Sequence, residues 1–63
     1  MRFVLEVDLE AGVLAGDARA AELGRILRYW GGVMKQVQLS PGSTQALYDS
    51  DNTEVGAWRV VAS

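Results

Sequence analysis

This sequence predicts an α+β fold: a three- to four-stranded, mainly antiparallel sheet with one amphipathic helix packed on one face, in the order β-α-β-β-β. Three observations predict it. Arg2–Glu10 alternates between apolar and charged residues, the segment after it has helical periodicity, and Leu47–Val61 has the pattern of two strands joined by a polar turn. A chain of 63 residues is expected to form a single small α+β domain, residues 1-63, because this length supports one hydrophobic core.

The first strand is expected over Arg2–Glu10. Its apolar residues are Phe3, Leu5, Val7 and Leu9, and its charged residues are Arg2, Glu6, Asp8 and Glu10. A period of two is typical of a half-buried strand, because successive side chains point to opposite faces of the sheet. Val4 is the one apolar residue on the charged side. Ala11–Gly16 is expected to be a loop.

The helix is expected to begin after Asp17, whose carboxylate can accept from free N–H groups of the first turn. A stripe of apolar residues then recurs at the 3-4 spacing of a helix that buries one face. It consists of Ala20, Leu23, Leu27, Trp30 and Met34, and is widened by Ile26 and Val33. Gly31-Gly32 is expected to end the helix, because glycine adopts the left-handed conformation common at that position.

Three further strands are expected. Val33–Leu39 alternates weakly and predicts the second strand, and Ser40–Ser43 carries Pro and Gly at the central positions of a type II turn. Thr44–Asp49 predicts the third strand and Glu54–Val61 the fourth. Asp51-Asn52 is expected to join them as a two-residue type I′ loop, because both residue types tolerate a positive φ.

This loop predicts a register in which Leu47 faces Gly56 and Tyr48 faces Val55. Trp58 and Val60 then lie toward the helix. Because one helix cannot cover both faces of a sheet, the apolar residues of the opposite face are candidate interface residues. They are Val4, Tyr48, Val55, Ala57 and Val61. We expect a homodimer formed through this face or through an edge strand, together with a protein partner.

Several kinds of chemistry are excluded by residue types. The chain has no cysteine and no histidine, so it has no disulfide, no Cys/His zinc site and no Ser-His-Asp nucleophile. Asp49–Glu54 begins like a calcium loop, but Glu54 and Val60 stand where that loop needs glycine and glutamate. The carboxylates of Glu6, Asp8 and Glu10 are expected to form a solvated strand face. We therefore expect no enzymatic activity, no cofactor and no metal.

Two other functions remain open from the sequence. One is DNA or RNA binding by the basic helix face, with Arg19, Arg25, Arg28 and Lys35 as candidate contacts. The net charge of −2 disfavours it, because nucleic-acid-binding domains are usually basic. The other is a subunit that only stabilises a larger assembly. No apolar stretch is long enough to span a membrane and no signal peptide is evident, so a soluble cytoplasmic protein is expected.

The C-terminal hairpin resembles that of a group of small β-α-β-β proteins of actinobacteria and of their phages and plasmids. The matching stretch is Tyr48-Asp49-Ser50-Asp51-Asn52-Thr53-Glu54-Val55-Gly56-Ala57-Trp58, preceded by a strand like Phe3–Leu9 and a helix rich in alanine and arginine. This chain departs from the group at Tyr48, where arginine is usual, at Asn52, where the turn glycine is usual, and in its longer Val33–Ser43 segment. The resemblance implies a small accessory protein encoded by a phage or mobile element. We expect such a protein to bind a host or phage protein in the host cytoplasm.

Overall fold

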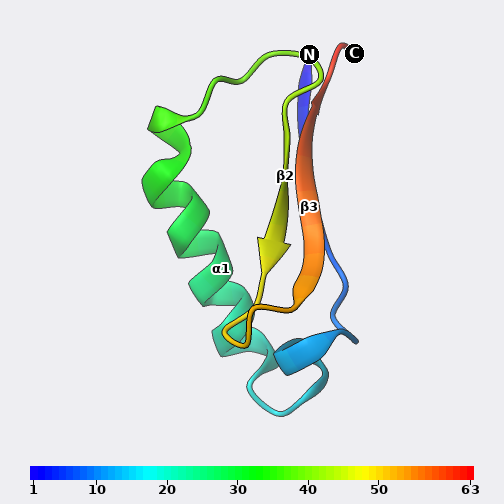
Figure 1. Cartoon of the computed structure of the whole chain (residues 1–63), viewed down its shortest axis with the longest axis vertical. Helices are drawn as coiled ribbons and strands as arrows, with labels where there is room; N and C mark the ends of the chain where they lie inside the picture. Colours follow the sequence, from blue (N-terminus) through cyan, green and yellow to red (C-terminus); the bar gives the residue numbers. More distant parts are fainter.

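One helix packs against one face of a three-stranded antiparallel sheet in the computed structural model, which describes residues 1–63 (Figure 1). The strands are β1 (Arg2–Val7), β2 (Thr44–Tyr48) and β3 (Glu54–Val61), and the helix is α1 (Arg19–Val33). The order β1-β3-β2 places the last strand at the centre. The predicted α+β fold, with one helix on one face of the sheet, is confirmed.

The first strand is shorter than the alternation predicts. β1 pairs with β3 from Arg2 opposite Val61 to Val7 opposite Gly56. It ends there because the chain turns at Asp8, whose Oδ1 accepts from the Glu10 N–H at 2.9 Å. Leu9, expected on the buried side, is exposed.

A short 3₁₀ segment, η1 (Gly12–Ala15), lies in the stretch that we expected to be a loop. It buries Leu14 completely in the core.

The predicted helix cap is wrong, because α1 begins one residue later than expected. Ala18 occupies the N-cap position, and no side chain caps the helix.

The buried face of α1 is rotated from the predicted stripe. Glu22 and Ile26 are buried, and Leu23 and Trp30 pack against the core. Leu27, which we placed in the stripe, is 47% exposed. Positions 22, 26 and 30 follow one another at intervals of four residues, so they share a face of the helix and turn Leu27 outward.

Gly31-Gly32 does not end α1, which continues to Val33 and into a second 3₁₀ turn, η2 (Met34–Gln36). The strand predicted over Val33–Leu39 is therefore wrong. Trp30, Met34 and Val37 all pack against the core, and their 4-3 spacing is helical and not that of a strand. The type II turn over Ser40–Ser43 agrees with the structure: the Ser43 N–H donates to the Ser40 carbonyl at 2.9 Å, and Gly42 has φ +97°.

The hairpin between β2 and β3 keeps only part of the predicted register. Leu47 faces Gly56 as expected, but Tyr48 faces Glu54 because the register shifts between Leu47 and Tyr48. This β-bulge leaves Val55 without a partner on β2 and turns its side chain into the core, where it is 2% exposed. The predicted type I′ loop is wrong as well: of its two residues, only Asn52 has a positive φ, 63°.

The core is small. Its buried apolar residues are Leu14, Ile26, Leu47, Val55, Trp58 and Val60. A Cβ at Gly56 would overlap the Glu6 carbonyl oxygen. Gly56 is needed because the backbone of β1 approaches it closely.

None of the helices has the length and apolar character required to cross a membrane.

Candidate functional site

A groove lies between α1 and the free edge of β2. Its volume is about 370 Å³. From α1 it is lined by Arg25, Ile26, Tyr29 and Trp30, and from the β2 side by Gln45, Ala46, Tyr48 and Asp49. We call it the α1–β2 groove. Figure 1 shows the two elements that form its walls, with α1 leaning away from the sheet toward its C-terminal end.

Aromatic residues give the α1–β2 groove its apolar character. Tyr29 is 57% exposed and Tyr48 is 48% exposed. The rings of Tyr29 and Trp30 meet edge to face with centroids 5.3 Å apart. Half-exposed aromatic side chains beside a cavity are common where proteins bind one another, because each provides a large apolar area and a polar tip.

The main chain of β2 borders the α1–β2 groove with unpaired groups. The Val60 N–H donates to the Ser43 carbonyl at 2.9 Å. In an antiparallel ladder, alternate residues bond to the same neighbour, so the N–H and C=O groups of Thr44, Ala46 and Tyr48 point away from β3. The Tyr48 carbonyl accepts from Arg25 Nη2 at 3.2 Å. The groups of Thr44 and Ala46 are left without a partner from another strand.

Glu22 joins α1 to the hairpin at one end of this groove. Its carboxylate accepts from Arg25 Nη2 at 3.0 Å, from the Ser50 N–H at 2.6 Å and from the Ser50 hydroxyl at 2.7 Å. The hydrogen bond from Arg25, followed by those from Ser50, lowers the pKa of Glu22 to about 2. Glu22 is buried although it is charged. The (i, i+3) spacing from Glu22 to Arg25 indicates the ion pair but not the contact with Ser50, 28 residues away.

Asp49 is the second buried carboxylate, and it shapes the hairpin loop. Its Oδ1 accepts from the N–H groups of Asp51 and Thr53, and its Oδ2 accepts from the Val13 N–H at 2.9 Å. The hydrogen bonds from Val13 and Thr53 lower the pKa of Asp49 below its ordinary value. Gly12, at φ +53°, is required here because a Cβ would overlap the Asp49 carboxylate.

The five predicted interface residues lie in three different parts of the structure. Val4, Ala57 and Val61 lie on the sheet face opposite α1 and are half-buried. Val55 corrects the prediction, because the bulge buries it in the core. It therefore lies neither on the outer sheet face nor in the α1–β2 groove. Tyr48 lines the α1–β2 groove. The ion pair between Arg59 Nη1 and Glu6 Oε1, at 2.8 Å, crosses the outer face and makes it partly polar.

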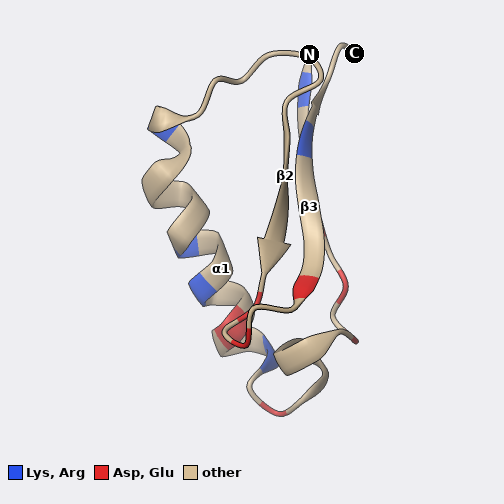
Figure 2. Ribbon diagram, in the orientation of Figure 1, with Lys and Arg blue, Asp and Glu red and all other residues tan.

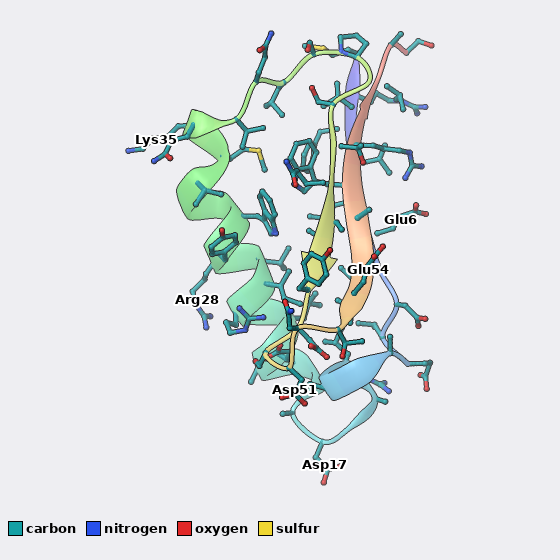
Figure 3. All side chains as sticks on the ribbon, in the orientation of Figure 1. Glu6, Asp17, Arg28, Lys35, Asp51 and Glu54 are labelled. Carbon is teal, nitrogen blue, oxygen red and sulfur yellow. The ribbon has the colours of Figure 1, made fainter.

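The four basic residues that are candidate nucleic-acid contacts also differ in their surroundings. Arg19 donates to Glu10 at 3.2 Å and to the Leu14 carbonyl at 2.9 Å, and Arg25 is bound to Glu22. Arg28 and Lys35 form no ion pair, and Figure 3 shows both pointing away from the sheet. Figure 2 places acidic residues beside the basic ones at the N-terminal end of α1.

No three carboxylates or other metal-binding side chains converge in the structure. Comparisons with protein-family models, with curated proteins and with solved structures find no match to this chain.

Proposed function

We propose that this chain is a non-enzymatic protein-interaction module, which acts as a small homodimer and binds an extended segment of a partner protein in the α1–β2 groove. The observation that supports this best is the combination of an aromatic cavity and an unpaired strand edge at one place. Peptide-binding domains that add a strand to a sheet use such a combination. Main-chain hydrogen bonds provide affinity, and the cavity selects a side chain.

In this proposal, the partner segment lies along β2 as a fourth strand. Thr44 and Ala46 provide the main-chain donors and acceptors, while Tyr29 and Trp30 receive a large apolar side chain of the partner. Arg25 is held by its bonds from Nε and Nη2 to Glu22 and from Nη2 to Tyr48. Its Nη1 makes no hydrogen bond within the chain and is free to donate to a carbonyl of the partner.

The test is to select binders from a library of displayed ten-residue peptides and titrate the best peptide by calorimetry. Tyr29→Ala removes an aromatic wall, and Ala46→Pro removes an outward N–H without removing a bond to β3. We expect each variant to weaken binding by more than about tenfold. Arg28→Ala, one position before Tyr29 and outside the groove, is the matched control and should bind like wild type. Equal binding by wild type, Tyr29→Ala and Ala46→Pro would place the binding site elsewhere, and a library without binders would reject the groove.

Self-association is the second part of the proposal. The core holds six buried apolar residues, and domains with so small a core commonly gain stability from a partner subunit. Light scattering at tens of micromolar should give twice the chain mass of 6.8 kDa. A monomer mass across that range would reject the homodimer while leaving the groove to be judged by its own test.

An accessory role in a phage or mobile element, in the host cytoplasm, is supported by the hairpin resemblance. Genes of a phage or plasmid beside this one would support that role, and housekeeping genes there would argue against it. The nucleic-acid alternative stays a prediction. It would now depend on Arg28 and Lys35, since Arg19 and Arg25 are bound to carboxylates. Retention on DNA at low salt, lost steeply as salt rises, would support it.

A further inference from the structure

The outer edge of β1 carries unpaired main-chain groups. β1 is an edge strand with β3 on one side. The Asp8 N–H donates to the Val55 carbonyl at 2.8 Å, so even-numbered residues of this segment bond to β3. The N–H and C=O groups of Phe3, Leu5 and Val7 therefore point away from the sheet.

This edge lacks two features that usually prevent strands from pairing with other chains, namely proline and a β-bulge. Natural edge strands are protected by proline, by bulges or by inward-pointing charges. β1 contains no proline, and its register with β3 runs without a shift. Phe3, Leu5 and Val7 are all apolar, and Phe3 is 45% exposed although its ring centroid lies 5.5 Å from that of Trp58.

The charges beside this edge are self-complementary. If two copies pair antiparallel with Leu5 facing the second copy's Leu5, then Phe3 faces the other Val7 and Arg2 faces the other Asp8. Arg2 and Asp8 form no ion pair within the chain: its three ion pairs are Arg19 with Glu10, Arg25 with Glu22 and Arg59 with Glu6. Opposite charges directly across a strand pair stabilise it.

Neighbouring registers fit less well. A shift of two residues in one direction places Glu6 opposite the other Glu6, which is repulsive. A shift of two residues in the other direction pairs Arg2 with the other Glu6, which is already bound to Arg59. A shift of one residue places main-chain groups that point away from the sheet in one copy opposite residues of the other copy that bond to their own β3. The hydrogen bonds between the two copies could then not form.

We infer that a second copy of this chain pairs with β1 in the register that places Leu5 opposite the second copy's Leu5, forming one continuous six-stranded antiparallel sheet. This inference rests on the homodimer part of the proposed function and identifies its surface. The two β2 strands become the outer edges of the joined sheet. Both α1–β2 grooves stay open, and the dimer is bivalent for its partner segment.

A charge exchange tests the pairing. Arg2→Asp and Asp8→Arg each place like charges across both ends of the interface, so each variant alone should dimerise about tenfold more weakly in sedimentation velocity. Mixed in equal amounts, the two variants face each other with opposite charges at both ends. The mixture should regain the wild-type dimer fraction as a heterodimer.

A thiol cross-link tests the register, because the chain has no native cysteine. Leu5→Cys should give a covalent dimer with a short thiol-reactive cross-linker, since paired residues across an antiparallel ladder lie about 5.5 Å apart between Cα atoms. Leu39→Cys, an exposed loop position, should remain monomeric on the gel. Circular dichroism verifies that each variant is folded. If a charge variant does not fold, the Leu5→Cys cross-link alone tests the pairing.

The outcomes separate the inference from the function on which it rests. A wild-type dimer with no restoration in the mixture and no Leu5→Cys cross-link would overturn the β1 pairing and leave the homodimer standing. A monomer at tens of micromolar would overturn both. Restoration in the mixture together with a Leu5→Cys cross-link would support the pairing and its register.

Discussion

The indole rings of Trp30 and Trp58 meet edge to face, with their centroids 5.7 Å apart and their planes at 78°. They are the middle of a row of four rings, since Tyr29 contacts Trp30 and Phe3 contacts Trp58. The row runs from the α1–β2 groove to β1. The two proposed interaction surfaces therefore lie at opposite ends of one aromatic cluster, which also joins α1 to the sheet.

The contact between the two indoles should be visible in circular dichroism. Because transitions of two indoles this close and steeply inclined couple, we expect the wild type to show an exciton couplet in the far ultraviolet. Trp30→Phe should abolish the couplet. Tyr29→Phe, which keeps both indoles, is the control and should retain it. A couplet that survives Trp30→Phe would mean that it has another origin.

The rotated face of the helix predicts a contrast between two leucines. Leu47→Ala should lower the free energy of unfolding by about 2–5 kcal/mol, because it leaves a cavity at a fully buried position. In a domain whose core supplies only about 3–5 kcal/mol, much of the protein would unfold. Leu27→Ala should change stability by less than about 0.5 kcal/mol, as surface substitutions do. Urea denaturation measures both, and a large loss at Leu27 would support the stripe that we first predicted.

The glycines of α1 predict a gain in stability. A Cβ at Gly31 would meet nothing within 4 Å, and one at Gly24 would meet only the flexible end of Arg28. Gly31→Ala and Gly24→Ala should each raise the free energy of unfolding by roughly 1 kcal/mol, since alanine is the better helix former. Gly56→Ala should be strongly destabilising because its Cβ would overlap the backbone of β1. Destabilisation by Gly31→Ala would show that this glycine is needed at the end of the helix.

The two buried carboxylates predict acid sensitivity. The pKa of Glu22 is lowered from 4.5 to about 2, and the pKa of Asp49 is lowered as well. A carboxylate with a lowered folded pKa binds fewer protons folded than unfolded, so its contribution is complete above the unfolded pKa. Stability should therefore fall as pH decreases from about 5 toward 2.

Glu22→Gln and Ser50→Ala test the source of that dependence. Glu22→Gln should be less stable at neutral pH and should lose less of its stability between pH 5 and pH 2 than the wild type does. Ser50→Ala removes the hydroxyl that donates to the Glu22 carboxylate but keeps the Ser50 N–H, so it should have the same effect to a smaller extent. Urea titrations at each pH measure this, and an unchanged slope in Glu22→Gln would show that other groups cause the acid sensitivity.

Local patterns predicted the elements whose signals were strong and short-range. Glu54–Val61 and the Ser40–Ser43 turn agree with the structure, because a buried strand and a Pro-Gly turn are encoded by adjacent residues. The strand expected over Val33–Leu39 was wrong because alternation over few residues is weak, and packing of Met34 and Val37 on the core favours a helical end. The burial of Glu22 is not predicted by any local pattern, because its partner Ser50 lies 28 residues away in sequence.

By itself, the sequence determined an α+β fold, a C-terminal hairpin and a sheet with one helix to cover it. It also excluded disulfides and histidine-dependent chemistry. Only the tertiary structure decided the bulge that buries Val55, the pairing of β1 with β3 and the groove between α1 and β2. These features depend on contacts between residues far apart in the chain, such as Asp49 with Val13 and Glu22 with Ser50. The periodicity of apolar residues indicates which side chains share a face of a helix or strand. Which other element that face packs against is determined by tertiary contacts.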